Sequence, residues 1–361
     1  MRSFLPFILP LTSLSAALAM GCSSNTGSGF GDAGTGQSSS SATFSCISCT
    51  STGTGTGTGH TTTTLVTEDA GTSTGSSGVT VTTIYADTDT ALYTLDPATN
   101  AVTMIGAFTG FSGATGDDGA TDLAVNAEGE VYINSESVIY KATLPAGGTG
   151  TVALTQIAKI ALKSNSFYAL AFAPANVLGM GETLVGGDNN GELWSIDPTT
   201  GATKDLGNFG PNPSDSSDIL GLSGDIVFYV NSAGAATGLA TIRSCSKSGN
   251  CTTKDDYLAG IDMQALQTAY TSGTPATSLL GGVYGGGSNS VGAGTNFAEL
   301  FGLGAWQGTV FGFGHSTGDL ITINTSGVGS LVTTISGTEW AGAGVSTKTT
   351  ITVAPPPPSA K

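Results

Sequence analysis

The chain has 361 residues, with 26 Asp and Glu against 10 Lys and Arg, and a formal net charge of −16. This acid surplus argues against a nucleic-acid partner, because phosphate backbones are bound through Lys and Arg, and it permits cation binding. Glycine is abundant at 55 residues and only 10% of residues are charged, but an apolar content of 39% predicts a folded core.

The first 21 residues have the pattern of a secretion signal. Arg2 supplies a positive charge, residues 4–11 open an apolar run, and small residues precede Cys22 in the sequence LAMGC. This pattern resembles a bacterial lipoprotein signal, and the alternative is an ordinary secretory signal cut nearby. The resemblance implies that Cys22 is lipidated. Because Ser23 is not an aspartate, it also implies an outer-membrane anchor in the cell envelope.

A low-complexity tether follows the signal. Residues 22–78 comprise Cys22 and a stretch rich in Ser, Thr and Gly, which has no hydrophobic period and predicts a disordered linker. Residues 354–361, APPPPSAK, predict a stiff polyproline-like tail. The folded domain is therefore expected at residues 79–353. No stretch after the signal reaches the ~18 consecutive apolar residues that a membrane span requires.

Four cysteines follow Cys22. Cys245 and Cys251 flank the segment SKSGN, and in an oxidising compartment this spacing predicts a disulfide that closes a hairpin, with unpaired thiols as the alternative. Cys46 and Cys49 lie within the tether, without the βαβ context of a redox motif, so we expect them to pair locally. The chain has two histidines, too few to favour a zinc site.

A strand–turn–strand phrase occurs twice without a gap. Residues 92–108 read LYTLDPATNAVTMIGAF, and residues 193–209 read LWSIDPTTGATKDLGNF. The Asp-Pro pair and the following Asn or Gly are turn chemistry, and the apolar runs on either side predict strands covered on both faces. Weaker copies stand at residues 138–148, 258–264 and 320–335.

A second element precedes the copies: a strand rich in Gly and Ala, a loop and another strand. It stands at residues 122–134, 168–187, 219–231 and 300–314. A unit of four strands that recurs at ~40–50 residues predicts an all-β fold of the β-propeller type. The blades, with their YxxDxxTG-like phrase, resemble the broad class of secreted bacterial NHL, YVTN and WD40-like propellers. That resemblance implies the fold and no particular ligand.

The two ends of the folded domain complete each other. Residues 81–96 provide strands that lack an inner partner, and residues 339–347, EWAGAGVST, provide an inner strand without successors. We therefore expect the N- and C-terminal strands to share one closing blade, which leaves no open edge. Counting gives five blades. Six is the alternative, because the long interval between residues 219 and 300 holds either an insertion with Cys245 and Cys251 or a hidden blade.

Four carboxylates stand at or just before predicted inner strands: Asp122, Asp218, Glu299 and Glu339. In a propeller these positions converge at the mouth of the axis, and clustered carboxylates repel unless they share a proton or bind a cation. The functional interpretation is a Ca²⁺ site or a polar ligand pocket. The structural alternative, which we favour, is that each accepts backbone N–H bonds from an inter-blade loop.

Three other motifs favour structural roles. The sequence GHSTG, with His315 and Ser316, matches a nucleophile elbow, but a strand rather than a helix follows it, so it predicts a hairpin turn. The acidic turns at residues 87–89, 116–119 and 186–192 lack EF-hand spacing. The three tryptophans, at positions 194, 306 and 340, are expected to pack between blades.

The shortage of catalytic side chains favours a non-enzymatic propeller of the cell envelope. We expect it to be held at the membrane by its lipid and to bind a protein, peptide or glycan ligand rather than nucleic acid. The alternative is an envelope glycan hydrolase that uses the carboxylates at the mouth of the axis as acid and base. The binding hypothesis and the hydrolase hypothesis differ in one structural expectation. In the hydrolase these carboxylates line an open cavity, whereas in the binding propeller they are held by hydrogen bonds.

Overall fold

The computed structural model describes residues 83–160, 167–231, 234–252, 255–287 and 289–351. The chain divides into two units, Met1–Asp69 and Ala70–Lys361, and every described residue belongs to the second unit. The predicted signal segment, lipidated Cys22, the tether with Cys46 and Cys49, and the Pro-rich tail lie outside the described residues. Within those residues, no helix is long and apolar enough to cross a membrane.

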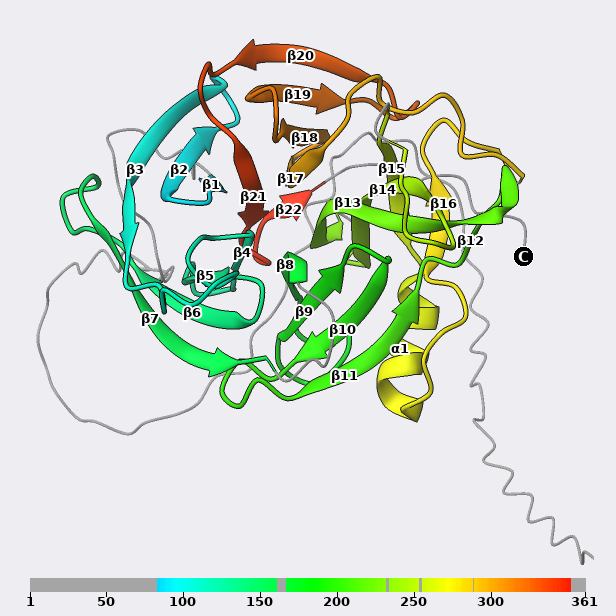
Figure 1. Cartoon of the computed structure of the whole chain (residues 1–361), viewed down its shortest axis with the longest axis horizontal. Helices are drawn as coiled ribbons and strands as arrows, with labels where there is room; N and C mark the ends of the chain where they lie inside the picture. The colour runs from blue at the N-terminus through cyan, green and yellow to red at the C-terminus, as the bar shows by residue number, and fades with distance from the viewer. Residues whose placement is uncertain (1–82, 161–166, 232–233, 253–254, 288, 352–361) are drawn as a thin grey trace, which may run out of the picture. The chain divides into compact units, whose positions relative to one another are not determined.

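Strand pairing groups the described strands into five sets of four antiparallel strands (Figure 1). From the centre outward, the first set is β21 (Trp340–Val345), β1 (Ile84–Thr88), β2 (Ala91–Asp96) and β3 (Ala101–Thr109). The second is β4 (Asp122–Val125), β5 (Val131–Asn134), β6 (Val138–Thr143) and β7 (Val152–Lys159). The third is β8 (Phe167–Ala173), β9 (Thr183–Asp188), β10 (Glu192–Ile196) and β11 (Thr203–Asn208).

The fourth set is β13 (Asp215–Asn231), β14 (Ala236–Ser246), β15 (Tyr257–Ile261) and β16 (Leu280–Val283), with β12 (Pro211–Asn212) beside β13. The fifth is β17 (Leu300–Trp306), β18 (Thr309–Gly314), β19 (Asp319–Ile323) and β20 (Gly329–Thr334). Two residues of β3 also pair in parallel with β7, which joins the first and second sets at their outer edges. We take each set as one blade and call the first the closing blade.

The innermost strands of the five sets form a closed circuit. β21 packs against β4, β4 against β8, β8 against β13, β13 against β17, and β17 against β21 again. Figure 1 shows these strands nearest the common centre, with the other strands of each set following outward. The described residues form a β-propeller.

The closing blade is made from both ends of the folded domain, as the sequence predicts. β1 and β21 pair antiparallel, from Ile84 opposite Val345 to Thr88 opposite Trp340. Trp340 is fully buried, and its ring meets the rings of Tyr93 and Phe313 edge-on at centroid distances of 5.2 and 5.3 Å. Because Tyr93 belongs to the closing blade and Phe313 to the fifth, this tryptophan packs between blades.

The duplicated phrase forms the two outer strands of the closing and third blades. In each copy the aspartate at the turn accepts backbone N–H bonds: Asp96 from Ala98 at 2.9 Å, and Asp197 from Thr199 at 2.8 Å. The turns then use a left-handed residue, Asn100 at φ 59° and Gly201 at φ 72°. The interpretation of these residues as turn chemistry is confirmed.

The fourth blade differs from the sequence prediction. Residues 219–231 are not two strands joined by a loop but part of the single 17-residue strand β13, whose register shifts between Leu222 and Ile226. The chain passes through Ser-Gly-Asp here without turning back, because Gly224 lies against the fifth blade: a Cβ on this glycine would be 2.4 Å from the Cα of Phe301. The shift works as a β-bulge that bends the strand toward the axis.

A helix occupies part of the long interval that the sequence assigned to an insertion. α1 (Met263–Ser272) follows β15 directly, so the expected strand–turn copy at residues 258–264 is wrong in its second half. Asp262 caps the helix by accepting from the backbone N–H groups of Gln264 and Ala265, and Gly273 ends it in the left-handed conformation. The helix, the long strands β13 and β14 and the loop to β17 account for the extra length of this blade.

Candidate functional site at the propeller axis

The axis has two ends. We call the end where the inner strands begin, near Asp122, Phe167, Leu300 and Trp340, the entrance end, and the end near Val125, Ala173, Asn231 and Val345 the exit end. The chain after β21 covers the exit end. Val125 and Ser346 form a parallel bridge, the Ser346 hydroxyl donates to the Asn126 carbonyl at 2.9 Å, and β22 (Thr350–Ile351) pairs with the end of β13.

One layer of the axis near the entrance end is built from equivalent positions of the five inner strands. The segments are DLAV (122–125), ALAF (169–172), DIVF (225–228), GLGA (302–305) and GAGV (342–345). Their first residues are two aspartates, an alanine and two glycines. A Cβ on Gly342 would lie 1.9 Å from Oδ1 of Asp122, so the missing side chain leaves the space that this carboxyl group fills.

Asp122 and Asp225 each join two neighbouring blades. Oδ1 of Asp122 accepts a hydrogen bond from the backbone N–H of the next residue, Leu123, at 2.7 Å. Oδ2 accepts a hydrogen bond from the backbone N–H of Leu170 on β8 at 2.5 Å. Asp225 makes the same contacts between the fourth and fifth blades. Its carboxyl group accepts hydrogen bonds from the backbone N–H of Ile226 at 2.5 Å and from the backbone N–H of Leu303 on β17. Every oxygen of the two carboxyl groups therefore receives a backbone hydrogen bond.

The two carboxyl groups also hydrogen-bond each other, and a third aspartate lies close by. Asp87, at the end of β1, faces the pair from the closing blade, and neither of its oxygens has a hydrogen-bond partner among the described residues. All three side chains have zero solvent exposure. Burial raises the pKa of each well above its ordinary value. Asp225 and Asp87 raise the pKa of Asp122 further, whereas for Asp225 the hydrogen bond with Asp122 lowers the pKa and the charge of Asp87 raises it.

The axis below this layer is packed rather than open. A cavity of about 10 Å³ lies among apolar residues of the inner strands, including Val125, Leu170 and Phe228. This is about the space of a single water molecule, and an apolar lining gives water no partners. Among the described residues, this part of the axis therefore has space for about one water molecule and not for a substrate.

The four carboxylates proposed from the sequence are distributed differently. Asp122 lies on the axis, whereas Asp218 is partly exposed in β13 and accepts from the Ser244 hydroxyl at 2.8 Å. Glu299 precedes β17 at φ 55° and accepts from the Ser316 hydroxyl, and Glu339 is exposed before β21. The carboxyl groups that interact with Asp122 are instead Asp225 and Asp87.

Asp225 and Asp87 are the residues that sequence reasoning missed. Asp225 belongs to a segment that we divided into strand, loop and strand, and Asp87 was assigned to an acidic turn. The signal was present in the similarity of DLAV to DIVF, which places Asp225, and not Asp218, at the position equivalent to Asp122.

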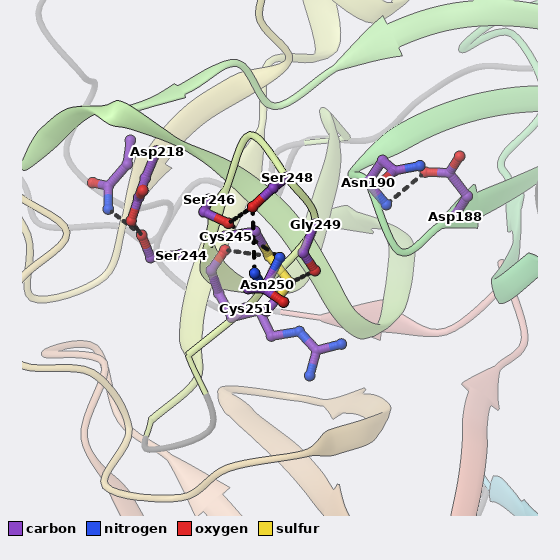
Figure 2. Close-up of a disulfide and its surroundings, with 12 residues drawn as sticks. Asp188, Asn190, Asp218, Ser244, Cys245, Ser246, Ser248, Gly249, Asn250 and Cys251 are labelled. Carbon is purple, nitrogen blue, oxygen red and sulfur yellow. Dashed lines mark hydrogen bonds between the residues drawn. A yellow bond between two sulfur atoms is a disulfide. The ribbon is translucent and has the colours of Figure 1, made fainter.

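The predicted disulfide is present at the entrance end of the fourth blade. Cys245 and Cys251 are joined at an S–S distance of 2.06 Å and close a hairpin turn, in which the N–H of Gly249 donates to the Ser246 carbonyl at 2.9 Å. Figure 2 shows this turn together with Asp218 and Asp188. Asp188 accepts the N–H of Asn190 at 2.9 Å, so this acidic segment is a turn, as expected.

The GHSTG segment is also a hairpin turn, as predicted, because antiparallel strands β18 and β19 flank it. The ring of His315 stacks on Phe301 at 4.5 Å, and its Nδ1 is 2.7 Å from the Trp340 carbonyl. Nearby, Asp256 accepts from the Ser223 hydroxyl at 2.5 Å and from the Leu300 N–H at 2.6 Å. Burial raises the pKa of Asp256 to about 6.

Metal-binding clusters and larger cavities are the other features that could mark a site among the described parts of the chain. Within the described parts of the chain, no group of three or more His, Cys, Asp or Glu side chains is arranged to hold a metal ion. A groove of about 830 Å³ lies elsewhere, beside α1, and is lined mainly by small and polar residues such as Pro211, Gln264, Thr268 and Thr277.

No protein-family model matches the sequence, and no curated protein matches it. Among solved structures, a protein of unknown function from Bacteroides caccae is 8% identical, with a TM-score of 0.36 over 74% of this chain and 99% of that chain. Virginiamycin B lyase from Staphylococcus aureus is 12% identical, with a TM-score of 0.29 over 69% of this chain and 64% of that chain. The Dos1 propeller is 11% identical, with a TM-score of 0.30 over 70% and 55%.

These similarities are too low to carry an argument about function. The chain also spans less than two thirds of the lyase and of the Dos1 propeller. The assignment of the fold therefore rests on strand pairing and on the closed circuit of inner strands.

Proposed function

We propose that the protein is a non-enzymatic binding or scaffold propeller of the cell envelope, anchored to the outer membrane through lipid on Cys22. The observation that supports this most directly is the state of the carboxylates on the axis. Asp122 and Asp225 are fully buried and hold neighbouring strands through backbone hydrogen bonds of 2.5–2.7 Å. The cavity found among the described inner strands measures about 10 Å³, which is too small for a substrate.

The glycan hydrolase alternative requires a different geometry. The paired acids of a glycosidase flank the sugar bond and stand about 5–5.5 Å apart in retaining enzymes, or about 6.5–9.5 Å apart in inverting enzymes, where the wider gap admits a water molecule. Asp122 and Asp225 hydrogen-bond each other and leave no such gap. Burial and hydrogen bonding instead make these residues part of the framework.

Of the two ends of the axis, the entrance end is the one that a ligand can reach, because the C-terminal segment covers the exit end. Its loops carry exposed acidic side chains, among them Asp89, Asp118 and Glu339. We propose that these loops recognise a protein, peptide or glycan, and that the predicted tether lets the propeller reach that partner from the membrane surface.

The test is affinity capture from envelope extracts with the full-length protein and paired surface variants. Asp89→Lys with Glu339→Lys reverses charge at the entrance end, and Glu128→Lys, on the exposed turn between β4 and β5 at the exit end, is the matched control. We expect the same partner with the wild type and the control and its loss with the double variant. Equal capture by all three proteins would contradict binding at this end.

Two further measurements address the anchor and the alternative. Cys22→Ala should move the protein out of the membrane fraction, and an unchanged distribution would contradict lipidation. Turnover of a panel of envelope glycans by the wild type, abolished by Asp122→Asn in a variant that still folds, would replace the binding proposal with the hydrolase.

A further inference from the structure

Asp122 and Asp225 hydrogen-bond each other across the ring of inner strands. The two residues come from the second and fourth blades, which are not neighbours, and each binds the N–H of an inner strand in the next blade: Leu170 on β8 and Leu303 on β17. Gly342 of β21 makes room for the Asp122 carboxyl group. All five inner strands therefore contribute to the site where these carboxyl groups meet.

This arrangement requires a proton. An ionised carboxylate only accepts hydrogen bonds, so two carboxyl groups can hydrogen-bond each other only when one of them is protonated. Both ionised forms side by side would repel strongly in a site without water. The four backbone N–H groups donate one hydrogen bond to each carboxyl oxygen of Asp122 and Asp225. They carry no full positive charge that could balance two carboxylates.

The charged groups around the pair add to the need for this proton. From β1, Asp87 faces the pair, and its carboxyl oxygens have no hydrogen-bond partner in the other residues that the structure describes. Asp89 lies just beyond it. The other inner strands present Leu170, Leu303 and Gly342 to the pair. The salt bridge recorded among the described residues joins Lys141 to Glu130, away from the axis.

We propose that a proton shared between Asp122 and Asp225 latches the ring of inner strands, so that the propeller is held most firmly at acid pH and loosens as the pH rises. Burial raises the pKa values of both groups above their ordinary range in the folded state. The stability that the pair contributes is therefore fully present below the pKa of an unfolded aspartate. It is lost as the pH rises through the raised folded values.

The direct test is infrared spectroscopy of the carboxyl C=O band, which separates a protonated carboxyl group from a carboxylate. Asp87 and Asp256 are buried too, so the parent protein is the full-length chain with Asp87→Asn and Asp256→Asn. We expect this parent to show a protonated carboxyl band at neutral pH. The band should disappear at alkaline pH, and it should be absent when Asp122→Asn and Asp225→Asn are both added.

A second measurement follows stability rather than the proton itself. The urea midpoint of the parent should fall as the pH rises, and Asp122→Asn or Asp225→Asn should reduce this slope. Asp96→Asn, on an exposed turn, is the control that should leave the slope unchanged. If the variants of the pair fail to fold, the pH titration of the parent's own band still decides.

Three results would overturn the latch. The first is a parent without a protonated carboxyl band at neutral pH. The second is a band that survives when both Asp122 and Asp225 are replaced by asparagine, because the proton would then lie elsewhere. The third is a urea midpoint that drops when divalent cations are removed with a chelator at constant pH, because a metal ion would then take the place of the proton.

Discussion

Gly342→Ala should destabilise the propeller more than its single added methyl group suggests. The new Cβ would lie 1.9 Å from Oδ1 and 2.6 Å from the Cα of Asp122, so β21 and β4 must separate or the carboxyl group must leave its site. Overpacking of this kind costs about 1–3 kcal/mol. Loss of one hydrogen bond from Asp122 to a backbone N–H adds about 1.5–3 kcal/mol.

The sum is about 3–6 kcal/mol, a large part of the 5–15 kcal/mol that stabilises a typical domain. For a domain of this size it lowers the unfolding temperature by roughly 10–20 °C, which circular dichroism or calorimetry of the full-length protein can measure. Gly147→Ala is the matched control, because Gly147 is exposed and a Cβ there would meet nothing within 4 Å. Equal unfolding temperatures for the two variants would show that β21 does not pack against Asp122.

Three other perturbations follow from the same structure. Trp340→Ala, which empties the contact between the closing and fifth blades, should cost about 3–5 kcal/mol in urea unfolding, and partly exposed Trp306→Ala should cost less. Replacing Cys245 and Cys251 by serine removes a bridge over a sequence separation of 6 and should cost about 2 kcal/mol by chain entropy; an unfolding temperature insensitive to reductant would contradict a stabilising disulfide. The pKa of Asp256 rises from 3.8 to about 6 on folding, so about 3 kcal/mol of stability should be lost as the pH rises from 4 past 6. Asp256→Asn should abolish that part of the pH dependence, and an unchanged profile would refute it.

The blade architecture could be predicted from sequence because its signals are local. The Asp-Pro turns at Asp96 and Asp197 repeat the same hydrogen bonds, and the alternation of small-residue strands with these phrases recurs along the chain. The pairing of β1 with β21 followed from two incomplete blades, one at each end of the folded domain. Each inference needs only a short window of residues and the rule that propeller edges must be paired.

The fourth blade and the axis could not be predicted in the same way. Ser223 and Gly224 look like a turn, but the contact of Gly224 with Phe301 of the next blade decides that the chain continues as a strand. The same misreading placed the inner-strand carboxylate at Asp218 instead of Asp225. Helix α1 was missed because its start was interpreted as a strand–turn copy, although Asp262 and Gly273 carry ordinary capping signals.

The buried acids on the axis have a physical reason that is independent of catalysis. Inner strands that converge on a line bring backbone N–H groups, such as those of Leu170 and Leu303, to positions where they bond a carboxylate oxygen of the preceding blade. An aliphatic residue in place of Asp122 or Asp225 would leave one of these donors buried and unsatisfied, at a cost of about 1–3 kcal/mol.

Glycine at position 342 leaves the space that the Asp122 carboxyl group fills. A pair of carboxyl groups in contact can remain only if it holds a proton. The carboxylates that the sequence suggested as a reactive centre thus differ in burial and in role. The axial group of Asp122 belongs to the framework, and exposed Glu339, at the entrance end, belongs to the surface that a ligand can reach. We therefore propose that a ligand is recognised by the entrance loops and not by the packed centre.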